Sequence, residues 1–381
     1  MSSWFSQLSS TVSNVTGLGA TVEAVKTVAE TVTDGQYYTA LDDHDLDWTL
    51  ASGSSTENQV FYVTTRKGGF AFVQLIHSNI GIWNPTISFT CRFYDPESKT
   101  SVFKNINMSK FELSADKRSV KTDFFNIQLD ADQRVYKINI THPELVVSLD
   151  FSRVDKGFKV GEGKTYLGGD QSSAAGFVSH KFWPRAVAKG TFIVNQDIYE
   201  IEGDGMFIHA IQGMQPQLIA SNWNFLNFHS EEASIAMMQF QTTKQYGSVN
   251  INQGSLVLNG KLVCVSVENT VELLDLKKDE DTDYNIPEKV KMTWKGKTIK
   301  EEGLEPEDVS IVMISEPKNL IDKIDVLSEI PYFLRKIVQS LIVKPYIYQW
   351  LDMTTAEITI GDKKTTVHGY CFQELVFVSE F

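Results

Sequence analysis

From about residue 36 onward, apolar and polar residues alternate along the chain with a period of two. Segments 87–93, 136–140 and 145–151 each place apolar side chains at every second position, with mostly polar residues between them. Successive side chains of a strand point to opposite faces, so this pattern is typical of strands with one buried face. The dipeptide Asn259-Gly260 between two apolar runs predicts a hairpin turn.

Many short strands separated by turn residues predict a mainly β fold of antiparallel sandwiches or barrels. Strands and helices do not alternate regularly, which disfavours a doubly wound α/β fold. A change of pattern near 215–221 divides the chain into halves of similar size. We therefore expect an N-terminal segment at 1–35, a first β domain at 36–216 and a second at 217–381.

The first twenty residues follow a helical pattern instead. Their bulky apolar residues recur at three- and four-residue steps, namely at Trp4, Phe5, Leu8, Val12, Val15 and Leu18. The opposite face is rich in Ser and Thr and carries no charge, which predicts an amphipathic helix that inserts into a membrane. A helix packed on the protein's own core is the alternative, but a Ser/Thr-rich terminal helix has little intrinsic stability. Acetylation of Ser2 after removal of Met1 would aid insertion by deleting a charge.

A second helical pattern lies near 319–343. Residues 320–327 form its first piece, and Pro331 restarts a helix whose apolar stripe includes Phe333, Ile337 and Leu341. Two interpretations of this insertion stand equally: a mobile cover over a ligand cavity, or a fixed plug at one end of a barrel.

Charge and cysteine content narrow the class of protein. The formal net charge is −13, and an acidic surface repels phosphate backbones, so we expect no nucleic-acid partner. The N-terminus lacks the basic start of a secretion signal. The three cysteines lie far apart with no zinc spacing, which predicts reduced thiols, no metal and a reducing compartment such as the cytosol.

Motifs for catalysis or a cofactor are not found. Gly163-Lys164-Thr165 ends like a phosphate-binding loop, but Phe158 stands where the first glycine is needed. The chain contains neither HExxH nor GxSxG. We therefore predict no catalytic residue, no cofactor and no enzymatic activity.

Aromatic and methionine side chains gather in three regions, at 180–185, 205–229 and 346–350. Such residues form either a barrel core or the wall of an apolar ligand cavity. The candidates for a cavity wall, with the stripe of the predicted insertion included, are Phe182, Trp183, Met206, Phe207, His209, Trp223, Phe225, Phe228, Met238, Phe333, Ile337, Leu341, Tyr348 and Trp350.

Four segments resemble a known family. They are HKFWPR at 180–185, FIHAIQG with SNWNFLNF at 207–228, IDKIDVLSEIP at 321–331, and KPYIYQW at 344–350. Together with the N-terminal helix they are similar, in order, to the fungal survival-factor family, whose members are named for oxidative-stress survival and treated as ceramide carriers.

The resemblance implies two tandem lipocalin-like antiparallel β-barrels. It implies a cytoplasmic protein that is peripheral on Golgi and endoplasmic-reticulum membranes through the N-terminal helix, with a nuclear pool as a further expectation. It also implies non-vesicular movement of ceramide from the endoplasmic reticulum to the Golgi for sphingolipid synthesis, in support of survival under oxidative and other stress. Inside the cavity, His209, Gln212 and Asn222 are candidates to hydrogen-bond the ceramide amide and hydroxyls.

Two other classes of function stand beside the carrier. A hydratase-like enzyme could act on an isoprenoid or another apolar substrate, with an acid such as Asp204 beside His209 protonating an alkene. A scaffold with both barrels filled would act only through its surfaces. A perturbed ionisable group inside the pocket favours the enzyme, and the lack of a sizeable cavity favours the scaffold.

Overall fold

The computed structural model describes residues 22–32, 35–50, 53–80, 85–108, 111–326 and 345–378. The predicted N-terminal helix with Trp4, Phe5, Leu8, Val12, Val15 and Leu18, and the predicted modification at Ser2, lie outside the described residues. The predicted helix with Phe333, Ile337 and Leu341 also lies outside them. These features stay predictions.

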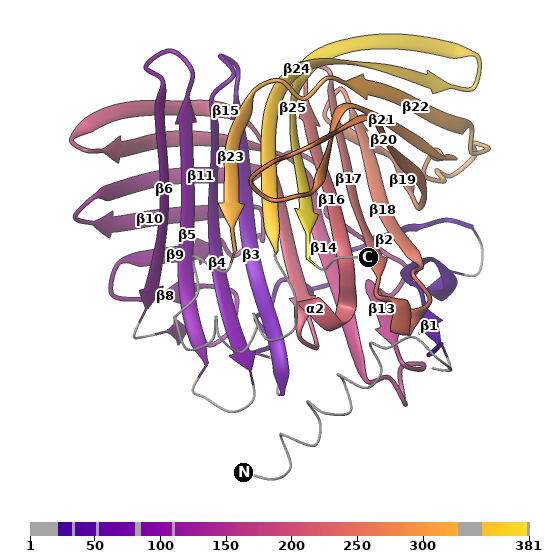
Figure 1. Ribbon diagram of the computed structural model, residues 1–381, viewed down its shortest axis with the longest axis horizontal. Helices are drawn as coiled ribbons and strands as arrows, with labels where there is room; N and C mark the ends of the chain where they lie inside the picture. The colour runs from indigo at the N-terminus through magenta and orange to yellow at the C-terminus, as the bar shows by residue number, and fades with distance from the viewer. Residues whose placement is uncertain are drawn as a thin grey trace.

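Two antiparallel sheets, which we name sheet A and sheet B, contain the described strands (Figure 1). Sheet A has fifteen strands: β1 (Val25–Lys26), β2 (Tyr38–Ala40), β3 (Ser54–Thr65), β4 (Phe70–Ile80), β5 (Thr86–Asp95), β6 (Thr100–Met108), β7 (Glu112–Leu113), β8 (Val120–Lys121), β9 (Phe125–Leu129), β10 (Val135–His142), β11 (Leu145–Arg153), β12 (Phe158–Val160), β13 (Lys164–Leu167), β14 (Gly176–Val194) and β15 (Asp197–Gln212).

Sheet B follows after the short helix α2 (Pro216–Ile219) and has ten strands. They are β16 (Ala220–His229), β17 (Ala233–Thr242), β18 (Asn250–Leu258), β19 (Lys261–Ser266), β20 (Glu268–Lys278), β21 (Asn285–Lys297), β22 (Asp308–Ser315), β23 (Leu320–Asp325), β24 (Tyr346–Ile360) and β25 (Lys363–Phe377). Two short 3-10 helices, η1 (Val28–Thr31) and η2 (Lys244–Tyr246), complete the described elements.

Alternation in the sequence becomes alternation of burial in the strands. In β10 the side chains of Tyr136, Ile138 and Ile140 are buried, while those between them are exposed. Asn259 and Gly260 both have positive φ and connect β18 to β19, which confirms the predicted hairpin.

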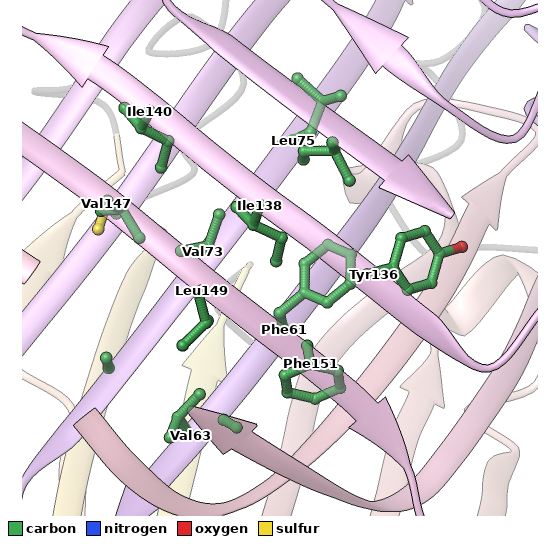
Figure 2. Packing of buried hydrophobic residues seen from close by; sticks show 14 of the residues in the cluster. Phe61, Val63, Val73, Leu75, Tyr136, Ile138, Ile140, Val147, Leu149 and Phe151 are labelled. Atoms are coloured by element: carbon green, nitrogen blue, oxygen red, sulfur yellow. The ribbon is translucent and has the colours of Figure 1, made fainter. Parts of the chain in front are cut away.

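Sheet A curls until its strands pack on one another. Its long path runs from β6 through β3, β15 and β14 to β7, and β6 and β7 are not paired in the part of the chain that the structure describes. Strands β3–β6 cross steeply over other strands of the same sheet (Figure 1). Figure 2 shows Phe61 and Val73 from β3 and β4 meeting Tyr136 and Leu149 from β10 and β11. Each sheet is thus a curled antiparallel sheet with an inner face, and the hydrogen bonds described do not close sheet A into a full barrel.

Three large clusters of buried apolar residues result. One fills the inner face of sheet A and includes Phe61, Trp183 and Phe207. A second fills the inner face of sheet B and includes Phe228 and Trp294. The third lies between the two sheets.

The helix predicted at 320–327 is wrong over the residues described. Residues Leu320–Asp325 form β23, an edge strand paired with β24. Apolar residues at helical spacing favoured a helix, but tertiary contacts decide the outcome. Asp322 forms an ion pair with Arg92 of sheet A, and Lys323 forms ion pairs with Asp279 and Asp281.

Residues 22–32, which we grouped with the N-terminal segment, pack on sheet A. Val25 and Lys26 pair with β13, and Val28 is buried beside them. Thr27 and Glu30 form a capping box for η1. In the described part of the chain, the structure contains no helix of the length and apolarity needed to span a membrane.

Candidate functional site

The predicted pocket residues separate into four places. Trp183, Phe207 and His209 belong to the inner side of sheet A, and Phe228 belongs to the inner core of sheet B. Tyr348 and Trp350 form a small cluster with Leu375. The structure brings five of the predicted residues together between the sheets: Phe182, Met206, Trp223, Phe225 and Met238.

The inner side of each sheet is occupied by the protein's own side chains. Phe61, Trp183 and Phe207 are fully buried inside sheet A. The cavity bounded by Met237, Val290, Met292 and their neighbours inside sheet B has a volume of about 10 Å³. A space of that size holds about one water molecule and no lipid chain.

His209 serves the structure of sheet A. Its Nδ1 lies 3.0 Å from the backbone oxygen of Asp45, and its Nε2 lies 2.8 Å from Oε1 of Glu57. Asp204 lies on the opposite face of β15, because five residues separate the two and the register is regular. Asp204 forms an ion pair of 3.0 Å with Arg185. The predicted pairing of Asp204 beside His209 is therefore wrong.

The two other predicted polar partners lie on different sides. Gln212 is on the same face of β15 as Met206, toward sheet B. Asn222 donates to Gln241 and shares a face of β16 with Leu226, toward the inside of sheet B. Of the three predicted polar partners, only Gln212 faces the region between the sheets.

A hollow of about 550 Å³ lies elsewhere, beside the β3–β4, β5–β6 and β14–β15 turns. Exposed charged side chains line it, among them Lys67, Glu97 and Glu202. Its charged rim makes it a poor site for apolar chains.

Five strands of sheet B present one continuous surface to sheet A, which we call the inter-sheet face. Directly paired residues of antiparallel strands share a face, so the register arranges this surface as three rows across β24, β25, β16, β17 and β18. The rows are Ile347, Val376, Trp223, Phe240 and Ile251, then Gln349, Glu374, Phe225, Met238 and Gln253, then Leu351, Phe372, Asn227, Ala236 and Ser255.

Sheet A contacts the inter-sheet face through aromatic rings and through a hydrogen bond between Gln253 and His180. The ring centroids of Tyr62 and Phe225 are 4.9 Å apart, and those of Phe70 and Phe372 are 4.2 Å apart. Nε2 of Gln253 lies 2.9 Å from Nδ1 of His180, and the amide donates to the ring nitrogen. Burial lowers the pKa of His180 to about 3, so this histidine is neutral at pH 7.

The face is not completely covered. Trp223, Met238, Ile347 and Val376 are each half-buried, whereas Phe240 and Ile251 in the same rows are buried. Apolar side chains that a folded chain leaves partly accessible are available for another apolar surface.

Polar groups interrupt this apolar surface. Nε2 of Gln349 donates to Oε2 of Glu374 at 2.6 Å, and burial raises the pKa of Glu374 to about 7. Oε1 of Gln349 and both amide atoms of Asn227 are buried and have no hydrogen-bond partner among the described residues. The sequence analysis did not predict Asn227, Gln349 or Glu374 as site residues. The polar pair Gln373-Glu374 inside an apolar strand was the signal that could have indicated one of them.

An ion pair and hydrogen bonds of two arginines join the two sheets beside this region. Arg92 of β5 is buried and forms an ion pair of 2.6 Å with Asp322 of β23. The same guanidinium donates to the backbone oxygen of Ile321. At the β16–β17 turn, Arg185 donates to the carbonyls of Ser230 and Glu231. Two arginines of sheet A thus bind sheet B at the edge strand β23 and at this turn.

Chemistry based on metals or thiols has no visible site in the described ranges. No group of three or more His, Cys, Asp or Glu side chains there lies close enough to hold a metal ion. Cys91, Cys264 and Cys371 are free and buried. Burial raises the pKa of the Cys264 thiol to about 12, which keeps it protonated and unreactive at neutral pH.

These features define a two-sheet, mainly β protein with an apolar face and a few buried polar groups between its sheets. The chain belongs to the Svf1 family, whose model matches residues 2–379. It is 32% identical to ceramide-binding protein svf-1 of Neurospora crassa, over 94% of each chain. It is 31% identical to ceramide-binding protein svf1 of Schizosaccharomyces pombe, over the whole of both chains.

Solved structures share the fold at low sequence identity. CghA superposes with a TM-score of 0.59 at 11% identity, covering 95% of this chain and 100% of its own. Kievitone hydratase from Nectria haematococca superposes with a TM-score of 0.53 at 13% identity, covering 91% and 98%. At these identities the similarity establishes the architecture and does not assign an activity.

Proposed function

We propose that this chain binds ceramide on the inter-sheet face and carries it between membranes, without vesicles, for sphingolipid synthesis. The observation that carries the proposal is the full-length similarity to relatives named as ceramide-binding proteins. The site geometry supports it, since the inner cores are filled and the inter-sheet face is an apolar surface that is partly accessible.

Ceramide presents the chemistry that this face complements. Its two long chains are stabilised by about 0.8 kcal/mol for each methylene removed from water. Trp223, Phe225 and Met238 supply apolar contact area. Its amide and hydroxyls need hydrogen-bond partners once they leave water, and the face contains buried polar groups in the same rows.

Membrane recruitment completes the proposed cycle. We propose that residues 4–18 bind endoplasmic-reticulum and Golgi membranes from the cytoplasmic side, and that stress survival follows from ceramide supply. Trp4→Asp and Phe5→Asp each place a charge on the apolar stripe, so these variants should lose membrane association in a liposome flotation assay. Undiminished flotation of both variants would contradict the helix hypothesis.

The ceramide proposal is tested on the purified full-length chain by mass spectrometry of its extracted lipids. We expect about one ceramide per protein in the wild type and at least a tenfold loss in Trp223→Ala. Tyr199→Ala is the control, because Tyr199 is a half-buried aromatic residue of sheet A outside the inter-sheet face. A wild-type protein that holds no ceramide and takes none up from liposomes would overturn the proposal.

A hydratase-like enzyme is the second candidate, and Glu374 is the observation that favours it. A carboxyl with a pKa of about 7 among apolar side chains is suited to protonate an apolar alkene. The test is incubation with an isoprenoid substrate and a search for the product with one added water. A product that disappears in Glu374→Gln would support the enzyme, and no product with the wild type would dismiss it for that substrate.

A further inference from the structure

We propose that Glu374 and Gln349 together form the polar anchor that holds the amide and hydroxyl groups of the ceramide headgroup. This inference rests on the proposed ceramide binding and assigns the recognition to two residues. It predicts discrimination between ceramide and lipids of similar chain length that lack an amide.

The position of the pair suits this role. Gln349 and Glu374 are direct cross-strand partners on β24 and β25, so their Cβ atoms lie about 5 Å apart. Both point to the inter-sheet face, in the same row as Phe225 and Met238. Half-buried Ile347 and Val376 form the adjacent row, so the pair stands beside the accessible part of the face.

The hydrogen-bonding capacity of the pair is only partly used. Nε2 of Gln349 donates to Oε2 of Glu374, whereas Oε1 of Gln349 is buried without a partner among the described residues. Gln349 itself is 2% exposed, so this carbonyl is sealed from bulk water. A buried acceptor without a donor is costly, and a ligand that supplies the donor removes that cost.

The chemistry of the pair matches a secondary amide flanked by hydroxyls. A protonated Glu374 has an O–H to donate to the amide carbonyl, and Oε1 of Gln349 accepts from the amide N–H or a hydroxyl. Across the interface, Tyr62 has a pKa that is raised by burial and by the charge of Glu374. A tyrosine side chain carries no positive charge in either protonation state, so Tyr62 does not form an ion pair with an ionised Glu374.

The experiment measures lipid uptake by the full-length chain from phosphatidylcholine vesicles doped with ceramide or with diacylglycerol of the same chain lengths. We expect the wild type to take up ceramide at least tenfold better than diacylglycerol. Glu374→Leu and Gln349→Leu should each lower ceramide uptake about tenfold and leave diacylglycerol uptake within about twofold. Glu374→Gln should retain the preference, because a neutral amide also carries a donor and an acceptor.

The control is Glu357→Leu, the same change at an exposed position of β24. Thermal unfolding confirms that each variant is folded. If the wild type takes up ceramide but the leucine variants match it, or lose both lipids equally, the pair has only a structural role and the anchor is overturned. If the wild type takes up no ceramide, the proposed function fails and the anchor fails with it.

Discussion

The inner core of sheet A and the inter-sheet face are built from the same kinds of residue but differ in how completely they are packed. Inside sheet A, aromatic rings are fully buried and His209 uses both ring nitrogens. Between the sheets, Trp223 and Met238 are half-buried. Buried polar atoms without a partner among the described residues occur in both regions, such as Nε1 of Trp183 and Oε1 of Gln349. Residue type alone therefore does not separate the structural core from the proposed binding surface, and the partial exposure of the apolar side chains is the difference between them.

The largest effect is expected for a substitution in the inner core of sheet A. Phe207→Ala removes a fully buried ring from sheet A and should lower the free energy of unfolding by about 4 kcal/mol. Urea unfolding measures the loss. Ceramide bound per folded molecule should stay unchanged, because Phe207 faces away from sheet B, and a parallel loss of ceramide would contradict the division between core and site.

A smaller effect concerns His180, on the sheet A side of the interface. Burial lowers its pKa from 6.5 to about 3, so below pH 6.5 the unfolded chain binds a proton that the folded chain does not. The contribution of His180 to the stability of the wild type should therefore decrease by about 3 kcal/mol as the pH falls from 7 to 4.

His180→Gln keeps a hydrogen-bond acceptor for Gln253 and should remove about this share of the pH dependence. Urea unfolding at pH 7, 5.5 and 4 measures it. His229 is also buried with a pKa of about 3, so the slope should decrease without disappearing. An unchanged slope would show that His180 is protonated in the folded protein.

Glu374 should give a pH dependence of the opposite sign. Its pKa is raised from 4.5 to about 7, so the folded chain holds a proton that the unfolded chain releases between these values. The stability that Glu374 contributes through this proton is fully present below pH 4.5 and is lost as the pH rises to 7. Glu374→Gln should therefore be more stable than the wild type by about 2 kcal/mol at pH 8 and nearly equal to it at pH 4.5. Thermal unfolding at both pH values tests this.

The smallest effect is expected for an exposed ion pair on the outer surface, which serves as a reference for the other charge effects. Lys291 and Glu272 form an exposed cross-strand ion pair of 2.9 Å on β20 and β21. Glu272→Gln should change the free energy of unfolding by no more than about 0.5 kcal/mol, and 0.5 M salt should erase the difference. A larger change would show that this pair contributes more to stability than an ordinary exposed ion pair.

The sequence predicted the strands better than the sites. Alternation fixes which side chains of a strand share a face, so the β class and the 258–261 hairpin were readable from the chain alone. The pairing of Glu374 with Gln349 was not readable, because it depends on a register between strands. The same limit explains Asp204 and His209, which are close in sequence but lie on opposite faces of β15.

Segment 320–327 shows a second limit. Leu320, Ile321, Ile324 and Val326 suit either a helical stripe or a strand. The choice is made by a partner far away in the sequence, β24, and by the ion pair of Asp322 with Arg92. Similarly, long-range pairing gathers five predicted wall residues between the sheets. Trp183 and Phe207 follow Phe182 and Met206 directly on β14 and β15, so they point to the opposite face, into sheet A.

The hydrogen bond of 3.1 Å between the backbone N–H of Val326 and the oxygen of Pro345 has a consequence for engineering. With Asp325 paired to Tyr346, it brings the chain at 326 and at 345 to adjacent points of one sheet edge. Two chain ends that lie this close can be joined by a short linker, because doubling the length of a flexible linker changes its closure free energy by only about 0.6 kcal/mol. We therefore expect a short Gly-Ser linker between residues 326 and 345 to preserve the pairing of β23 with β24.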